Sequence, residues 1–147
     1  MPTQANPFRT GFIIIAHAPL ASALKACAVH VFPEKEPLIG TFDVTPQTTL
    51  DNGLAPCLKI AGALQATQLL VITDIIGATP FNLSKKLIDT FANTSHTTKA
   101  IKLISGANMP MLMRALTYSH EPLGKLTLLA VEGAVKGVVD VSPTVDS

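Results

Sequence analysis

The sequence is poor in the side chains with which proteins bind nucleic acids. It contains no Trp and one Tyr, and only 14% of its residues are charged. Its 11 Lys and Arg residues are scattered along the chain, and the formal net charge at pH 7 is +1. Nucleic-acid binding usually requires a basic patch or aromatic rings on which bases can stack. We therefore do not expect nucleic acid as a partner.

Long apolar runs and paired cysteines are also missing. Uninterrupted apolar runs are a few residues long, whereas a membrane-spanning helix needs roughly 20. Residues 1–10 contain one Arg and two Pro but no apolar segment, which argues against a secretory signal. Cys27 and Cys57 are distant in sequence, and each lies in a helical pattern as a small core residue. We expect a cytoplasmic protein without membrane insertion.

The composition is that of one globular domain. The chain has 147 residues, of which 48% are hydrophobic, enough to bury a core. We predict a single domain over residues 11–141, a flexible lead-in over 1–10 and a flexible C-terminus over 142–147. Short apolar runs alternate with helical patterns, which predicts an α/β fold with a doubly wound, mainly parallel four-stranded sheet and helices on both faces.

The pattern gives approximate bounds for these elements. Strands are expected at residues 11–16, 38–44, from 69 to Asp74, and at 100–104. Helices are expected at residues 19–33, from about 49 to 65, and at 79–91, 111–118 and 123–139. Pro56 lies inside the second helix, which is therefore either kinked or begins only at Pro56. Residues 138–141 suit a short strand as an alternative to the last helical turn.

The stretch from residue 69 to 83, LLVITDIIGATPFNL, organises the chain. A buried strand reaches Asp74, turns through Gly77 and enters a helix. Thr79 suits the N-cap position and Pro80 the first helical position, so the nearby backbone amides should attract an anion. Ligands of open α/β sheets bind outside the carboxyl ends of the strands, so Asp74 should lie at the mouth of a crevice.

His17 ends another central strand and should lie at the same edge. A carboxylate beside an imidazole fixes its tautomer and leaves the far ring nitrogen as a base, nucleophile or metal ligand. With a helix N-terminus beside them, His17 and Asp74 favour a phosphoryl group carried on histidine. A structural histidine is the alternative that this position alone leaves open.

Other kinds of site find little support. The chain has no GxxxxGK[ST] and no GxSxG, which argues against a nucleotide P-loop and a hydrolase elbow. His30, His96 and His120 lack ligand spacing, so we expect surface residues and no metal site. The methionines at 109, 111 and 113 are expected to pack in the core. Asn108 suits either an ordinary helix cap or a residue of the site.

Three motifs together resemble a known family. They are the apolar strand that ends in His17, TDIIGATPFN at residues 73–82, and SGANMPML at residues 105–112. The chain resembles the mannose-type IIA proteins of the bacterial phosphoenolpyruvate-dependent sugar phosphotransferase system (PTS), and the matches run from about residue 11 to 137. This resemblance implies the same doubly wound sheet.

The resemblance also implies an activity. His17 would accept a phosphoryl group at Nε2 from the phosphocarrier HPr, and Asp74 would be its partner at Nδ1. Thr79 lies where the family has a small hydroxyl residue near the phosphate, and Gly77 and Ala78 adjoin it. No cofactor is implied. Supporting roles are possible for Thr73 and Asn108.

The sequence departs from the family beside the histidine. The family usually has Gly directly after it, and here Ala18 and Pro19 follow. Pro19 has no backbone N–H, so one amide donor to the phosphate is expected to be missing or displaced.

The resemblance further implies partners. Because the chain ends at Ser147, the IIB acceptor is expected on a separate chain. A homodimer is expected, in which a C-terminal strand at residues 138–141 is exchanged onto the partner's sheet. The alternative function is a regulatory binding module whose phosphorylation state at His17 controls a partner protein.

Overall fold

The computed structural model describes residues 8–93 and 99–145. One parallel sheet contains the strands β1 (Thr10–His17), β2 (Ile39–Val44), β3 (Gln68–Thr73) and β4 (Ala100–Ser105), in the order β2-β1-β3-β4. The central strands are the most apolar segments of the chain, and residues 12–16 of β1 are fully buried. Burial on both faces explains why these strands read as continuous apolar runs.

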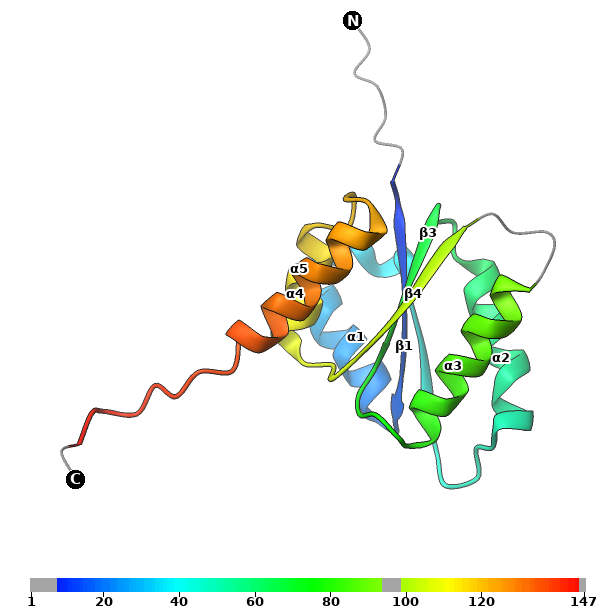
Figure 1. Cartoon of the computed structure of the whole chain (residues 1–147), viewed down its shortest axis with the longest axis horizontal. Coiled ribbons are helices and arrows are strands. Elements are labelled where there is room, and N and C mark those ends of the chain that lie inside the picture. Colours follow the sequence, from blue (N-terminus) through cyan, green and yellow to red (C-terminus); the bar gives the residue numbers. More distant parts are fainter. Residues whose placement is uncertain (1–7, 94–98, 146–147) are drawn as a thin grey trace, which may run out of the picture.

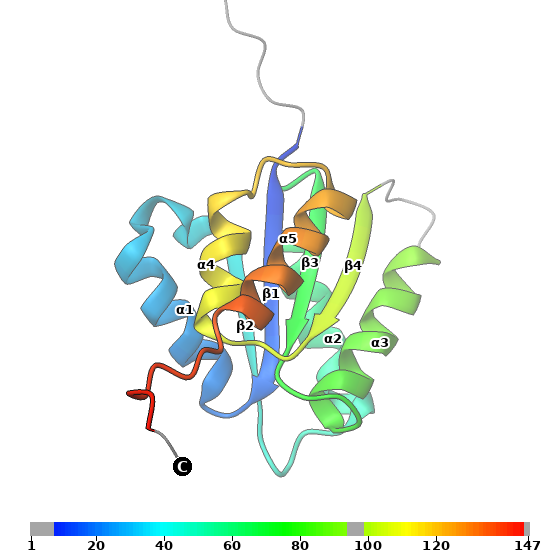
Figure 2. The same ribbon diagram turned by 60° about the vertical axis from the view of Figure 1, so that its left-hand side comes forward.

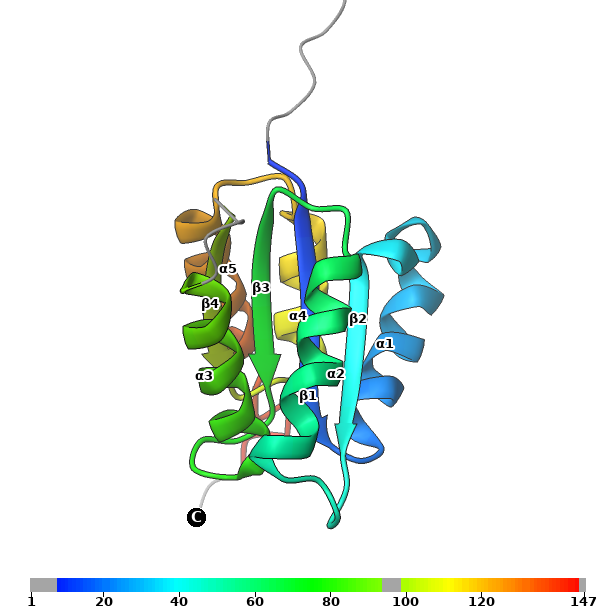
Figure 3. The ribbon, with the colours of Figure 1, turned by 90° about the vertical axis from the view of Figure 1, so that its right-hand side faces the viewer.

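Helices cover both faces of the sheet (Figure 1). The first face carries α1 (Leu20–Val31), α4 (Met109–Thr117) and α5 (Leu123–Lys136), which lie in front of the strands in Figure 2. The second carries α2 (Leu50–Ala63) and α3 (Thr79–Ala92), which lie in front in Figure 3. Alternate side chains of the strands therefore enter two separate hydrophobic clusters, with Ile14 and Ile72 in the first and Ile15 and Val71 in the second. The predicted doubly wound fold is confirmed.

Several predicted boundaries need correction. A 3-10 helix, η1 (Pro33–Leu38), occupies the segment before β2, because Pro33 and Pro37 suit a short tight turn and not a strand. The helix α2 begins at Leu50, where Thr49 and Asn52 form a reciprocal capping box, and it continues through Pro56. The last helix ends at Lys136, three residues before the predicted end at Val139.

The prediction that both cysteines lie in the core is wrong for Cys27. Cys57 is buried, as predicted, and burial raises its pKa to about 12. Cys27 is exposed, because α1 packs through Ala21, Leu24 and Ala28. Successive helical residues are about 100° apart around the axis, which turns Cys27 away from the stripe that contains Ala28. The methionine prediction is confirmed, since Met111 is buried and Met109 and Met113 pack against the same cluster.

The start of β1 and the segment after α5 differ from the predicted ends of the domain. Thr10, predicted as part of the lead-in, is buried and is the first residue of β1. Residues 138–145 leave the end of α5 and run away from the sheet and helices as an extended segment (Figure 1). They form no strand within this single chain, so the strand expected at residues 138–141 would need a second chain. His30 and His120 are exposed as expected, while His96 lies outside the described residues.

Candidate active site

His17 and Asp74 meet where the order of the strands reverses. β1 is followed by α1 on one face of the sheet, and β3 is followed by α3 on the other. Loops that leave adjacent strands toward opposite faces open a crevice at the carboxyl edge of such a sheet. His17 is the last residue of β1 and Asp74 directly follows β3, so the two side chains flank this crevice.

The carboxylate of Asp74 orients the imidazole of His17. Its Oδ2 lies 2.7 Å from Nδ1 of His17 and accepts a hydrogen bond of 3.0 Å from the His17 backbone N–H. Its Oδ1 accepts one of 3.0 Å from the Ile75 N–H. A proton on Nδ1 is thereby favoured, which leaves the lone pair of the neutral ring on Nε2.

The two side chains differ in their exposure to solvent. The side chain of Asp74 is 12% exposed, whereas that of His17 is 53% exposed. Burial raises the pKa of Asp74, but the hydrogen bonds from His17 and Ile75 and the charge of the ring outweigh it and hold the pKa below its ordinary value of 3.8. A carboxylate that stays ionised beside the ring can stabilise a positive charge that forms on it.

The N-terminus of α3 lies next to this pair. Gly77 turns the chain with a φ of +86°, a conformation that side chains other than glycine rarely adopt. The N-cap is Ala78, so the prediction of Thr79 as the cap is wrong by one position, and Thr79 and Pro80 are the first two helical residues. Ala78 has no side-chain oxygen to accept from the first amides of the helix, which therefore remain available to an anion.

A depression of about 320 Å³ joins Thr79 to His17. Its other lining residues are Ala18 and a group from the end of β2 and the loop after it: Val44, Thr45, Pro46 and Thr48. The sequence of residues 45–49 is typical of a turn and a helix cap. β2 is a neighbour of β1, and its carboxyl end opens at the same edge. The position of β2 beside β1 was the signal that could have identified Thr45 and Thr48 as residues near His17.

The backbone at Ala18 and Pro19 contributes no free donor. The Ala18 N–H donates to the carbonyl oxygen of Val44 over 2.8 Å, and Pro19 has no N–H. Neither residue after the histidine therefore offers a free backbone N–H to an anion.

A second depression of about 330 Å³ lies on the other side of Asp74. Ile75, Ile76, Ser105 and Gly106 complete its lining. Ile75 and Ile76 are 56% and 70% exposed, which is unusual for side chains of this size beside polar groups. Nearby, Thr73 is fully buried, and neither its Oγ1 nor the Oγ of Ser105 has a hydrogen-bond partner among the described residues.

Asn108 has a structural role that accounts for both of its polar groups. Its Oδ1 accepts from the Met111 N–H over 2.9 Å and caps α4, and its Nδ2 donates to the carbonyl oxygen of Ala134 over 3.2 Å. It lines neither depression beside Asp74.

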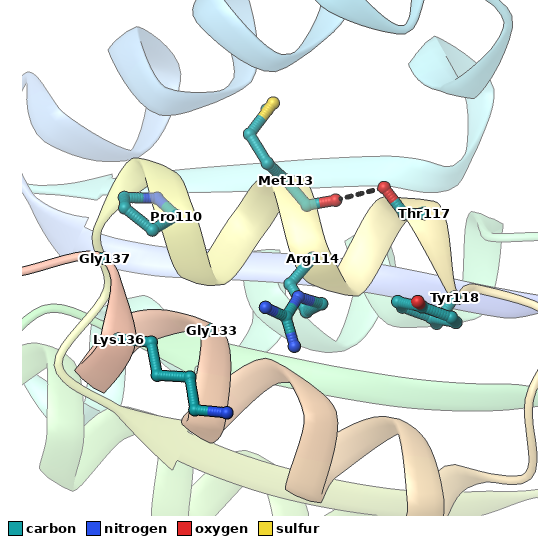
Figure 4. Close-up of a pocket in the computed structure, with 8 residues that line it drawn as sticks. All are labelled: Pro110, Met113, Arg114, Thr117, Tyr118, Gly133, Lys136 and Gly137. Atoms are coloured by element: carbon teal, nitrogen blue, oxygen red, sulfur yellow. Dashed lines mark hydrogen bonds between the residues drawn. The ribbon is translucent and has the colours of Figure 1, made fainter.

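The largest of the described depressions lies elsewhere, between α4 and α5, with a volume of about 380 Å³ (Figure 4). Two of its polar side chains are engaged: Lys136 pairs with Glu132, and the Thr117 hydroxyl donates to the Met113 carbonyl oxygen. It shares no lining residue with the His17 site.

Among residues 8–93 and 99–145, no three His, Cys, Asp or Glu side chains gather where they could hold a metal ion. Within the same ranges, none of the helices combines the length and apolar character of a membrane span.

Comparison with protein families identifies the chain. The model of the EIIA-man family, described as the PTS system fructose IIA component, matches residues 11–128. The chain belongs to this family. The matched range of this EIIA-man protein includes His17, Asp74 and Thr79. No match is found among curated proteins.

Solved structures share the EIIA-man fold. A phosphotransferase system component EIIA from Streptococcus agalactiae is 24% identical with a TM-score of 0.75, over 89% of this chain and 96% of that one. The mannose/sorbose specific IIA subunit from Enterococcus faecalis is 18% identical with a TM-score of 0.76, over 95% and 99%. A sigma-54 interaction domain protein from Enterococcus faecalis is 12% identical with a TM-score of 0.65, over 90% and 97%.

Proposed function

We propose that this EIIA-man protein accepts a phosphoryl group on Nε2 of His17 from phospho-HPr and passes it to a IIB partner. The observation that carries the proposal is the 2.7 Å contact between Nδ1 of His17 and Oδ2 of Asp74, which directs the nucleophilic nitrogen toward solvent. Family membership supports it, since the match covers both residues.

The proposed step balances without a cofactor. The lone pair of Nε2 attacks phosphorus, the N–P bond of the donor phosphohistidine breaks, and its electrons return to the donor ring. The phosphorylated His17 ring keeps its proton on Nδ1 and becomes cationic, and the Asp74 carboxylate stabilises that charge. Transfer to IIB reverses these roles.

The phosphoryl oxygens would lie in the depression between His17 and Thr79. The first amides of α3 and the hydroxyls of Thr45, Thr48 and Thr79 are the groups we assign to them. Gly77 contributes the turn that allows these amides to face the site, and Ala78 leaves them uncapped.

The protein partners would dock beside the histidine. Ile75 and Ile76 are exposed next to Asp74 and provide an apolar contact for HPr and IIB, which must approach His17 in turn. We further propose that the protein acts in the cytoplasm and forms a homodimer through residues 138–141.

Phosphorylation tests the proposal directly. Incubation with phosphoenolpyruvate, enzyme I and HPr is expected to add one acid-labile phosphoryl group, measured by intact mass. The His17→Ala variant should remain unlabelled, whereas His30→Ala, His96→Ala and His120→Ala should be labelled like the wild type. Undiminished labelling of the His17→Ala variant would refute the assignment.

A regulatory module is the second candidate. The fold is shared with a sigma-54 interaction domain protein, and exposed Ile75 and Ile76 would suit a regulated partner as well as a IIB protein. Rapid transfer from the phosphorylated chain to a purified IIB protein favours the carrier. Stable phosphorylation with no transfer to any IIB protein favours the regulator.

A further inference from the structure

The helix that follows His17 has no cap of its own. α1 begins at Leu20, three residues after the histidine, and its N-cap is Pro19, whose side chain has no oxygen to accept a hydrogen bond. The first turn of α1 contains no acidic residue. The amides at the start of a helix have no partner within it, so an uncapped helix begins less firmly. The start of α1 therefore depends on an acceptor from elsewhere in the chain.

Asp43, near the end of the strand β2, supplies this acceptor. β2 lies beside α1 (Figure 3). Oδ1 of Asp43 accepts a hydrogen bond of 3.1 Å from the backbone N–H of Ser22, the third residue of α1. The side chain of an N-cap residue usually accepts at this position, and a negative charge there suits the positive end of the helix dipole. A different element of the fold thus caps α1.

A second hydrogen bond ties the same turn to β2. The Ala18 N–H donates to the carbonyl oxygen of Val44 over 2.8 Å. β2 therefore holds the chain at the residue directly after His17 and again at Ser22. The backbone from residue 18 to 22 is fixed at both ends, and with it the position from which the imidazole extends.

The ring of His17 depends on this support. Asp74 holds Nδ1 and the His17 N–H from the side of β3, but 53% of the His17 side chain is exposed. A shift of the turn after β1 would move Nε2 relative to Thr79 and the first amides of α3. Misplacement of a reacting group by 1 Å costs roughly 100-fold in rate. The hydrogen bond between Asp43 and Ser22 thus bears on the reactivity of the histidine.

We propose that Asp43 is a positioning residue for phosphoryl transfer by His17. It caps α1 from β2 and thereby keeps Nε2 directed at the N-terminus of α3. Asp43 does not line the depression that joins His17 to Thr79, so it acts through the backbone and not on the phosphoryl group. This role rests on the proposed function, since it concerns the rate of that transfer. A cap that served stability alone would leave the rate of the folded protein unchanged.

Quench-flow labelling at increasing concentrations of phospho-HPr tests this role. Asp43→Ala removes the acceptor, and the labelling rate at saturating phospho-HPr is expected to fall about tenfold. The concentration that gives half of the maximal rate should stay unchanged, because Asp43 is not assigned to the docking surface. Asp43→Asn keeps an oxygen that can accept from the Ser22 N–H, and should restore the rate to within about twofold of the wild type.

Asp51→Ala is the matched control. Asp51 also lies in the first turn of a helix, α2, but its side chain is 98% exposed and that helix is capped by Thr49 and Asn52. The Asp51→Ala variant should be labelled as fast as the wild type. Circular dichroism checks that each variant is folded. If Asp43→Ala is unfolded, Asp43→Val takes its place with the same expected slowing, because valine suits a strand and has no acceptor.

The outcomes distinguish this role from the proposed function. Slow labelling without the acceptor, restored in Asp43→Asn, supports the positioning role. If the wild type is labelled on His17 and the variant without the acceptor is labelled equally fast, the positioning role is overturned and the proposed function stands. The same holds if Asp43→Asn is as slow as that variant, or if Asp51→Ala slows as much. If the wild type is not labelled on His17, both are overturned.

Discussion

At the residue scale, Asp74 links the fold to the chemistry. Its Oδ2 accepts hydrogen bonds from both the backbone and the ring of His17, so one carboxylate holds the end of β1 and orients the imidazole. A substitution there should affect both stability and transfer, and the two effects can be separated by pH.

Asp74→Asn is expected to leave the protein folded at neutral pH and to slow phosphorylation of His17. The amide is similar in shape but cannot stabilise a cationic ring, and loss of a carboxylate in a comparable catalytic triad lowers the rate by about 10⁴. Quench-flow labelling from phospho-HPr measures the rate. A variant that is labelled as fast as the wild type would remove Asp74 from the mechanism.

The pH dependence of the unfolding free energy tests the hydrogen bonds assigned to the Asp74 carboxylate independently of the transfer rate. Because the pKa of Asp74 is lowered in the folded state, its contribution to stability is complete above its pKa in the unfolded chain and is lost as pH falls through the lowered value. The difference in unfolding free energy between wild type and Asp74→Asn should therefore shrink below pH 3.8, the ordinary value. Urea titrations at neutral and acidic pH measure it, and a difference that widens toward acid would contradict the assigned hydrogen bonds.

Substitution of Thr73, unlike that of Asp74, is not expected to lower the stability of the protein. Its hydroxyl is buried and has no partner among the described residues, which costs about 1–3 kcal/mol. Thr73→Val should therefore leave stability unchanged or raise it by about 1 kcal/mol in urea denaturation. Because the resemblance to the family allows Thr73 a supporting role at the site, His17 labelling in Thr73→Val is expected to slow although the fold is no weaker.

Ser105→Ala is the matched control for that experiment, because its Oγ is the neighbouring buried group without a partner. A loss of more than about 1 kcal/mol in Thr73→Val would mean that the hydroxyl is satisfied in solution.

The residues of the site differ in how well the sequence predicts them. That His17 and Asp74 would meet followed from the rule that parallel strands open at one edge. Thr45 and Thr48 were missed because their hydroxyls lie in a loop whose sequence reads as an ordinary turn. Asn108 was ambiguous, because a helix cap and a site residue have the same signature.

At the element scale, the close approach of α4 and α5 depends on glycine. A Cβ at Gly133 would lie 2.7 Å from Cβ of Arg114, and one at Gly137 would lie 2.2 Å from Cβ of Pro110. Figure 4 labels Gly133 on α5 and Gly137 at the end of that helix, beside α4. A larger residue at either position must push the helices apart.

Gly133→Ala is expected to destabilise the protein by about 1–3 kcal/mol in urea denaturation, because overpacking costs more than the gain in helix propensity. Gly124→Ala, in the same helix with open space at its Cβ, should instead stabilise it by up to about 1 kcal/mol. Equal effects of the two changes would show that α4 and α5 do not pack as described.

Elements were predicted well where a single physical signal dominated. β1, β3 and β4 are mainly apolar segments, and each of their ends lies within one residue of its predicted position. The predicted boundaries of elements are wrong where two sequence preferences apply to the same residues. Ala78, and not Thr79, is the N-cap, because the turn at Gly77 comes directly before it. Leu38, predicted as the first residue of the second strand, is the last residue of the proline-containing helix η1.

At the scale of the whole molecule, apolar surface is concentrated at the C-terminal end. Leu128 and Val135 on α5 are 73% and 70% exposed, and Val138, Val139 and Val141 are exposed in the segment that follows. Such surface is costly in water and marks an interaction site. Apart from the Val138 N–H, which donates to the Val135 carbonyl oxygen, the backbone of residues 138–141 offers hydrogen-bonding groups that a second chain could satisfy.

The full chain is therefore expected to be a homodimer at micromolar concentration, measured by light scattering coupled to size exclusion. A chain that ends at Lys136 should shift to monomer, whereas one that ends at Val141 should retain the dimer. A monomeric full chain would refute the dimer. A dimer that survives removal of residues 137–147 would refute only the role of the exchanged strand.

The depression beside His17 has one more consequence. The residues that line it include no Lys or Arg, so a phosphoryl group carried on His17, as we propose, would be surrounded by backbone amides and hydroxyls. Lys or Arg side chains around the phosphoryl group would stabilise the phosphorylated protein and slow transfer to the acceptor. A phosphate site without cationic side chains would stabilise the phosphohistidine only slightly. The N–P bond would then keep most of the phosphoryl-transfer free energy of the donor, and this free energy would remain available for transfer to the acceptor protein.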